Sequence, residues 1–498
     1  MSVNWIHNIP FFSIFGIMLT GILTALINDG RKAKKLHLTV IAIIFVMSLI
    51  LLGSVVKNNE SFTFMMGHFP APWGNELKAG PIEALMACAF SVVMFCTVLA
   101  GQEEIHSDIV AEKQKFFFIM LNLLFGSMLA LIYTNDLFTA YVFIEINAIA
   151  SCSIVMAKSN GRALSAAMLY LVMGSLGSGL FLFGISTLYD ITGHLLIPNI
   201  YEQVQLLVAQ QQYIIPLTLS AGMCIVGVGI KSAMFPFHSW LLTAHPVAVS
   251  PASAILSGLV LKGYVFLIVK MIFSVFGYNV IDQLGITHVL FFVGLVGMIY
   301  GSICALKEVK LKNMLACSSV AQVSYLFMGL GMGIEAGCMA TIFHIMAHAV
   351  SKAALFCSAG GLIDASEHHK SIKELQGSAR RNPIAGLTFT ISALSIVGVP
   401  LFAGFVSKFY FAWSAFNTES AITLFVVLII LGLSMILNAM YFIPMLINIW
   451  TKKAEKEEVM PVKLSYKLAC AGFIFCNFLL GIGFGPIINI IEQGMKFF

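Results

Sequence analysis

The amino-acid sequence predicts an all-α polytopic membrane protein with about 14 transmembrane helices. Of its 498 residues, 59% are apolar and only 10% are charged, whereas soluble domains carry about 25% charged residues. Apolar runs of about 20 residues, the length that crosses the hydrocarbon core of a bilayer, recur from Ile9 to the C-terminus. Transmembrane barrels are built from strands of about ten alternating residues, so these unbroken runs exclude a barrel.

The expected spans follow one another with short polar connections. The first run has no basic segment before it and no small-residue cleavage site, so it is interpreted as a retained helix and not a signal peptide. Ten cysteines lie almost entirely inside spans and form no CxxC pair, which argues against iron–sulfur clusters, structural zinc and disulfides. The spans are 9–29, 37–56, 81–101, 116–133, 136–156, 163–189, 213–234, 247–272, 286–305, 312–333, 337–362, 384–413, 421–449 and 465–490.

Lys and Arg are strongly biased toward alternate loops. With an even number of spans both termini share a side, and the positive-inside rule then places the basic set in the cytoplasm and both termini outside. The net charge of +5 therefore reflects topology and is not a nucleic-acid-binding surface. Four basic residues belong to the opposite set, Lys57, Lys78, Lys270 and Lys496, against twenty in the cytoplasmic set: Arg31, Lys32, Lys34, Lys35, Lys113, Lys115, Lys158, Arg162, Lys307, Lys310, Lys312, Lys370, Lys373, Arg380, Arg381, Lys452, Lys453, Lys456, Lys463 and Lys467.

Five charged residues lie inside the spans, away from their ends, and have no topological role. They are Lys231, Lys262, Lys352, Lys408 and one acid, Glu145, about ten residues into the fifth span. A charge at the centre of a transmembrane helix costs roughly 2.5–3.5 kcal/mol unless it is paired, hydrated or neutralised. One such residue could be a packing partner, but five in one chain favour a function.

Two of these lysines adjoin predicted helix breaks. Lys231 precedes Pro236 by five residues, and the segment GVPLFAGFVSKFY places Pro400 before Lys408. Proline removes a backbone donor and obstructs the preceding turn, and interrupted helices at membrane depth line ion paths. One break in each half predicts two inverted five-helix repeats.

A polar row is expected on the helix that contains FHIMAHAVSKAALF. His344, His348 and Lys352 are four residues apart and share one helix face. Two histidines at this spacing could bind zinc, but no acidic third ligand is nearby. A proton relay is favoured because neutral imidazole both donates and accepts.

Three further residues extend this hypothesis. Lys262, in SGLVLKGYVF, would join the relay between Lys231 and the histidine row. His238 and His245 flank the cytoplasmic end of the seventh span. They are either proton-uptake groups or ordinary loop histidines.

Together these segments resemble the antiporter-like subunits shared by Mrp-type sodium/proton antiporters, respiratory complex I and energy-converting membrane-bound hydrogenases. The resemblance implies that Glu145 and Lys231 form a buried ion pair, that Lys262 and His348 connect two half-channels, and that Lys408 ends the second. It covers roughly residues 120–420, and its carriers are the Glu145 segment, KSAMFPFHSWLLTAHPVAVSPASAILSGLVLKG, LKNMLACSSVAQ, FHIMAHAVSKAALF and GVPLFAGFVSKF.

The chain departs from the family pattern at Leu242 and Leu401, where proline is usual, and at Cys317, where tyrosine is usual. No titratable group of the row is lost, but the bends of both interrupted helices are affected. FMMGHFPAPWGNELKAGPIEALM looks most like the D-type subunit of Mrp antiporters. The expected organisation is three helices in 1–115, a translocating core in 116–420 and C-terminal helices in 421–498.

The predicted function is proton translocation by a subunit of a cation/proton antiporter or redox-driven pump in a prokaryotic cell membrane. Protons, or sodium as the alternative, would move along Glu145, Lys231, Lys262, His344, His348, Lys352 and Lys408. No catalytic site, metal or cofactor is expected in this chain, so partner membrane subunits would supply any driving reaction. The rivals are a structural subunit that anchors a redox module and a stand-alone secondary transporter.

Overall fold

The structure is a computed structural model that describes residues 5–70, 73–452 and 458–498. It is almost entirely helical, as the sequence predicts. The helices are α1 (Ile9–Ala25), α2 (Gly30–Asn58), α3 (Pro81–Ala100), α4 (Gln102–Asp108), α5 (Ala111–Tyr133), α6 (Leu137–Val155), α7 (Gly161–Thr192), α8 (Ile197–Ala209), α9 (Ile214–Lys231), α10 (Ser239–Val247), α11 (Ser250–Ile255), α12 (Leu261–Lys270), α13 (Tyr278–Gln283), α14 (Ile286–Lys307), α15 (Leu311–Gly331), α16 (Glu335–Ala365), α17 (Ser378–Arg381), α18 (Pro383–Val397), α19 (Ala403–Phe416), α20 (Ala421–Trp450), α21 (Leu464–Ile482) and α22 (Phe484–Met495).

The polytopic architecture is confirmed. Within the described residues, 13 helices are long and apolar enough to cross a membrane. The predicted span 384–413 is found as two shorter helices, α18 and α19, with a break between them. Large apolar side chains on the outer face of α20 are exposed, including Ile422 (77%) and Phe425 (63%). A surface of this kind is suited to contact with lipid.

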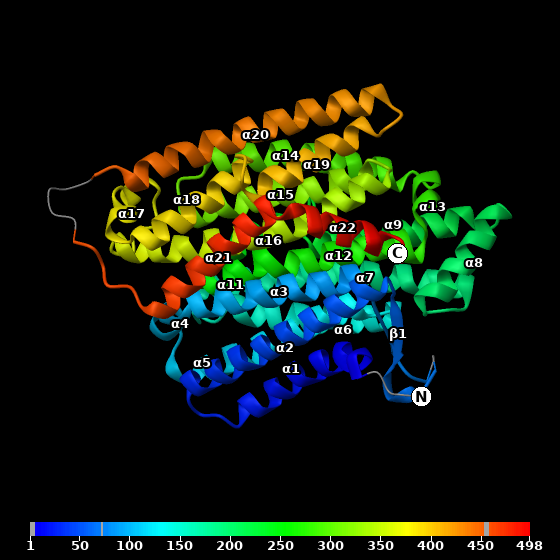
Figure 1. The fold of residues 1–498 in the computed structure, drawn as a ribbon, viewed down its shortest axis with the longest axis horizontal. Coiled ribbons are helices and arrows are strands. Elements are labelled where there is room, and N and C mark those ends of the chain that lie inside the picture. Colours follow the sequence, from blue (N-terminus) through cyan, green and yellow to red (C-terminus); the bar gives the residue numbers. More distant parts are fainter. Residues whose placement is uncertain (1–4, 71–72, 453–457) are drawn as a thin grey trace.

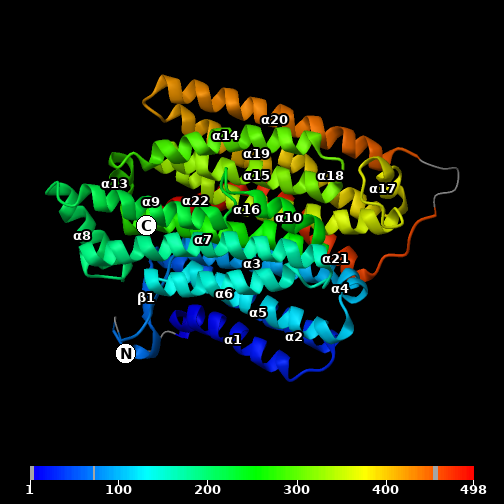
Figure 2. The same cartoon turned by 180° about the vertical axis from the view of Figure 1, so that it is seen from behind.

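Helix α1 begins and helix α22 ends at the same end of the bundle (Figure 1). A hairpin of β1 (Phe62–Met65) and β2 (Glu76–Ala79) lies at that end, with Phe62 opposite Ala79 and Met65 opposite Glu76. The connections that carry most Lys and Arg lie at the opposite end, which we call the basic end; α4 and α17 mark it in Figures 1 and 2. Lys453 and Lys456, two residues of the predicted cytoplasmic set, fall outside the described residues.

Helix α9 packs unusually close to α7 because glycines face each other. A Cβ atom on Gly227 would lie 2.6 Å from the carbonyl oxygen of Gly177, and a Cβ on Gly177 would lie 2.6 Å from that of Gly227. Small residues permit this approach between transmembrane helices. The contact sits one turn before Lys231 and therefore fixes the position of that lysine against α7.

Both predicted helix breaks are present. Helix α9 ends at Lys231, and residues 232–238, including Pro236, separate it from α10. The sequence left α10 outside any span, whereas the structure shows it as the second half of this interrupted helix. Pro400 lies in the second break, between α18 and α19. Leu401 there has φ of 79°, which proline, fixed near −65°, cannot adopt. A proline at residue 401, which is usual in the family, would therefore not fit the backbone of this break.

Candidate functional site

Glu145 of α6 and Lys231 of α9 form the predicted ion pair. Lys231 Nζ lies 3.4 Å from Glu145 Oε1 and is almost fully buried, while the Glu145 side chain is 33% exposed. Ser178 of α7 also donates a hydrogen bond to Glu145 Oε1. The resemblance implies a buried ion pair, and Lys231 is buried in this way, but the Glu145 side chain is one-third exposed. Its pairing, however, is as expected.

Hydrogen bonds also join α6 to α12 and α5 near the residues that carry Glu145 and Lys262. Tyr264, two residues beyond Lys262 on α12, donates to Asn147 Oδ1 at 2.9 Å. Asn147 lies two residues from Glu145 on α6 and donates to Ser127 Oγ at 3.0 Å. Tyr264 and Asn147 were not predicted from the sequence, since a single Tyr or Asn in a span is common and carries no sign of its partner.

Lys262 is the second residue of α12, which follows directly on a π-helical turn, η3 (Leu256–Val260). Its ammonium donates to the carbonyl oxygen of Ser257 within that turn. Lys352 of α16 donates to the carbonyl oxygen of Leu315 on α15 at 3.0 Å. Both lysines are 0% exposed. Their partners are neutral carbonyl groups, so neither ammonium has a counterion in its hydrogen-bond shell among the described residues.

The histidine row of α16 lies between these lysines and the second break. The rings of His344 and His348 are stacked, with centroids 5.5 Å apart. His344 Nδ1 is 2.9 Å from Ser407 Oγ of α19, whereas His344 Nε2 and both nitrogens of His348 have no hydrogen-bond partner in the described part of the chain. Buried polar atoms in this state are sites for internal water, and the imidazoles can exchange protons through it.

Lys408 of α19 is the last residue of the row, and its side chain lies against the C-terminal end of α18. Its ammonium donates to the carbonyl oxygens of Ile396 and, at 2.9 Å, Val397. These are the last residues of α18, whose terminal carbonyls have no partner inside the helix. Lys408 Nζ also lies 5.6 Å from the centre of the Tyr325 ring. The lysine therefore caps one half of the interrupted helix from the other half.

Two side chains of α15 belong to the same row and were not singled out from the sequence. Gln322 is 0% exposed, and neither atom of its amide has a partner among the described residues. The hydroxyl of Tyr325 is also unpartnered there, and its ring is 5.5 Å from that of His344. The feature of the sequence that could have indicated Gln322 is a polar glutamine within an apolar span, at the end of the segment LKNMLACSSVAQ.

The structure separates His238 from His245. His238 lies in the first break, with its ring 5.0 Å from that of Tyr300. His245 lies on α10, is 0% exposed and stacks on Phe356 of α16 at 4.6 Å. Neither ring nitrogen of His245 has a partner within residues 5–70, 73–452 and 458–498. Of the two, it is His245 that contacts the helix carrying the histidine row.

A second buried acid–base pair was missed. Lys270 Nζ lies 3.8 Å from Glu83 Oε1, with both side chains 3% exposed, and donates to the carbonyl oxygens of Ile132 and Thr134. Glu145 was the one buried acid expected from the sequence, and the structure adds Glu83 as a second. Lys270 lies at the end of α12, as the sequence indicated, but it is buried and paired with Glu83. Lys270 caps the C-terminus of α5, which explains it without a role in transport.

No group of three His, Cys, Asp or Glu side chains in the described part of the chain is arranged to hold a metal ion. His344 and His348 therefore stand without a third ligand of that kind. Their neighbours are Ser407, Tyr325 and the lysines of the row, which favours proton exchange as the chemistry of the site.

Comparison with known proteins identifies relatives across most of the chain. A family model described as "NADH:quinone oxidoreductase/Mrp antiporter, TM" matches residues 134–458. The NADH-quinone oxidoreductase subunit N of Desulforudis audaxviator is 27% identical over 405 residues, covering 80% of this chain and 78% of that protein. The D subunit of the Na(+)/H(+) antiporter of Alkalihalophilus pseudofirmus is 27% identical over 447 residues, covering 88% and 86%.

Two solved complexes contain chains with the same fold. One is an archaeal membrane-bound sulfane sulfur reductase, with a TM-score of 0.84, 23% identity and coverage of 99% of this chain and 96% of the other. The second is the Mrp complex of Dietzia sp. DQ12-45-1b, with a TM-score of 0.86, 19% identity and coverage of 99% and 97%.

Proposed function

Because the chain belongs to the NADH:quinone oxidoreductase/Mrp antiporter transmembrane family, we propose that it is the proton-translocating membrane subunit of a multisubunit antiporter or respiratory complex. The observation that carries the proposal is the row of buried titratable groups that crosses the bundle. Lysines and histidines bind and release protons, whereas protonated ammonium groups repel sodium ions. The proton is therefore the ion that this row suits.

We assign a different step of proton transfer to each part of the row. Glu145 holds charge beside Lys231, and a change in that pair alters the proton affinity of the next group because neighbouring charges shift pKa values. Lys262 and His348 receive the proton near the centre, and His344 passes it toward Lys408. We assign this translocating core to residues 116–420, with 1–115 and 421–498 as flanking helices.

Other membrane subunits are the proposed partners. The Glu145 side chain is one-third exposed on the outer face of α6, and a carboxylate facing lipid at this depth is costly. A neighbouring subunit that covers Glu145 would remove that cost. We place the basic end in the cytoplasm and both termini outside, on the basis of the charge bias; reporter enzymes fused to either terminus test this topology.

The test is flux through the reconstituted complex. Lys231→Ala and Lys408→Ala are each expected to abolish proton translocation in vesicles, measured with a pH-sensitive dye and normalised to the amount of assembled complex. If both variants assemble and translocate at the wild-type rate, the proposed row is wrong. A purely structural subunit would instead lose assembly while retaining flux in whatever complex remains.

A further inference from the structure

A cavity of about 210 Å³ opens at the basic end, away from the row described above. We call it the basic-end cavity. Its wall comes from the start of α4, the start of α11, the end of α16 and the segment before α21. The lining includes Glu104, Ser250, Gly360 and Asp364. The volume is sufficient for several water molecules at about 30 Å³ each.

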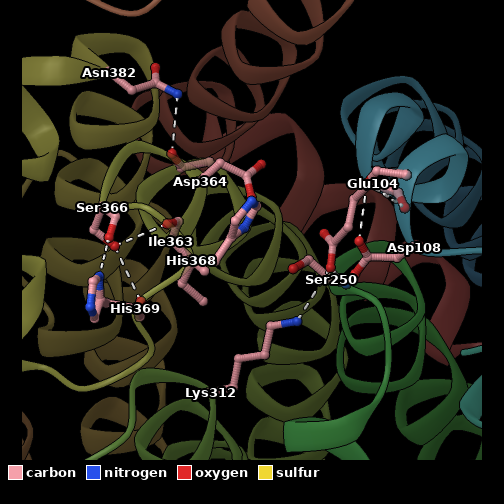
Figure 3. Close-up of polar contacts among 12 residues, drawn as sticks. Glu104, Asp108, Ser250, Lys312, Ile363, Asp364, Ser366, His368, His369 and Asn382 are labelled. Carbon is pink, nitrogen blue, oxygen red and sulfur yellow. Dashed lines mark hydrogen bonds and ion pairs between the residues drawn. The ribbon is translucent and has the colours of Figure 1, made fainter. Parts of the chain in front are cut away.

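Two oxygen atoms converge on one point of this wall. Ser250 Oγ and Glu104 Oε2 lie 2.8 Å and 3.1 Å from the place that a Cβ atom on Gly360 would occupy. Ser250 is 1% exposed, and its hydroxyl has no partner among the described residues. Figure 3 shows Glu104, Ser250 and Asp364 around the same space. A buried hydroxyl left unpaired beside a carboxylate provides a polar site for water or hydronium.

The rim of the cavity contains both signs of charge. Glu104 Oε1 lies 3.6 Å from Lys312 Nζ and 4.0 Å from Lys158 Nζ and accepts a hydrogen bond from the Ser250 amide at 2.8 Å. Asp108 pairs with Lys158 at 2.5 Å. Other charged or titratable neighbours are the Glu103–Lys463 pair at 2.6 Å, the Asp364–His368 pair at 3.3 Å, Lys34 of α2 in electrostatic reach of Glu103 and Lys463, and Cys357 and Tyr466 in the wall. Glu104 Oε2 is thus the carboxylate oxygen directed away from the lysines.

Two residues that line the cavity, Gly360 and Asp364, lie on the same ridge of α16 as the histidine row. His344, His348, Lys352, Phe356, Gly360 and Asp364 follow one another at intervals of four residues, along one ridge that winds slowly around the helix. Lys352 and Gly360 are about 12 Å apart along the axis. Phe356 occupies the middle of that gap and carries no polar atom that could pass a proton.

His245 lies at this gap. Its ring stacks on Phe356, and the charged groups in electrostatic reach of it are Lys352, Lys312 and Lys262. Lys312 also donates to the carbonyl oxygen of Ala248, three residues from His245, at 3.1 Å. The unpartnered imidazole therefore lies beside Phe356, in the gap between the cavity and Lys352.

We propose that the basic-end cavity is the proton-uptake vestibule of this subunit, with Glu104, Ser250 and Asp364 as its receiving groups and His245 as the relay to Lys352. The inference rests on the proposed proton-translocating function and deepens it. Hydronium in the cavity gives a proton to one imidazole nitrogen of His245 and becomes water, and the other nitrogen releases its proton to Lys352 while that lysine is a neutral amine. No electron transfer or co-reactant is needed.

The first experiment measures flux in the complete complex against the pH on the basic-end side. His245→Phe is expected to lower flux about 100-fold, the contribution of a positioned proton-transfer group. Glu104→Gln is expected to shift the pH dependence on that side alone toward acid by about one unit, because it removes a receiving charge. Glu112→Gln, an exposed carboxylate at the same end, is the matched control and is expected to leave the profile unchanged.

The outcomes separate the two proposals. If Lys408→Ala is inactive while His245→Phe and Glu104→Gln keep the wild-type rate and profile, the vestibule is refuted and the row stands. If Lys408→Ala itself is active, the proposed function fails. A His245→Phe variant that does not assemble leaves Glu104→Gln to decide.

A second experiment tests access without relying on flux. In Ser250→Cys, the thiol is expected to react with a small cationic methanethiosulfonate reagent from the basic-end side of oriented vesicles. It should react more slowly with an anionic one, because the carboxylate oxygen Glu104 Oε2 lies next to residue 250, whereas the lysines pair with the other oxygen of Glu104. Wild-type vesicles correct for Cys357 in the same wall. Reaction only from the opposite side, or faster reaction with the anionic reagent, contradicts the proposal.

Discussion

Replacing Lys408 with arginine separates its two roles. Lys408 donates to two terminal carbonyls of α18, and hydrogen bonds from a charged donor contribute about 1.5–3 kcal/mol each. Part of this is offset by the burial of the ammonium, so Lys408→Met should lower stability by about 3 kcal/mol. Arginine keeps a charged donor for the carbonyls, but it does not release a proton because its pKa exceeds 12. We therefore expect Lys408→Arg to assemble and to translocate protons at least about 100-fold more slowly.

The assay compares the amount of assembled complex with the proton flux per complex in proteoliposomes. Lys270→Arg is the matched control, since Lys270 also caps a helix C-terminus through two carbonyls but lies outside the row. It is expected to keep wild-type flux per complex. Wild-type flux in Lys408→Arg would refute the relay role of Lys408 and leave only the cap.

Three further predictions concern packing and ion pairs. Gly227→Ala places a Cβ atom 2.6 Å from the Gly177 carbonyl and should lower the unfolding free energy by about 1–3 kcal/mol, seen as a lower thermal midpoint. Glu83→Ala leaves a buried ammonium unpaired and should cost about 3 kcal/mol, with flux per assembled complex unchanged. Burial raises the pKa of Asp108, but the hydrogen bond and charge of Lys158 outweigh it and hold that pKa below its ordinary value. Asp108→Asn should therefore cost less than about 1 kcal/mol near pH 7, and thermal midpoints should converge as pH falls through the folded-state pKa.

Much of the fold and most residues of the row were predictable, because charged side chains are rare in membrane spans and are easily recognised in the sequence. Lys262 and Lys352 stand out in apolar runs, and the four-residue spacing of His344 and His348 places them on one helix face whatever surrounds them. The two breaks were marked by proline. These features depend on local sequence and on the cost of charge in lipid.

Contacts between distant helices were not predictable in the same way. The pair Glu83–Lys270 joins α3 to α12, and each residue lies near a helix end, where a charge is unremarkable. Lys312 counted as a loop charge, yet it is 8% exposed and bonded to the loop before α11. Glu145 was expected to be buried, but the helices packed around α6 leave its side chain partly exposed. These outcomes depend on how helices stack, and neither spacing nor composition encodes that stacking directly.

Hydropathy and charge along the chain were enough to establish a bundle of many membrane spans, the end that carries the positive charge, and the titratable residues at membrane depth. Hydrophobic length, loop charge and helical period are properties of short segments and can be counted. Helix packing, in contrast, is what brings Lys408 to the end of α18, stacks His245 on Phe356, and directs Glu104 and Ser250 toward Gly360. Most of these contacts join segments far apart in the chain, and the close packing of side chains in three dimensions sets their distances.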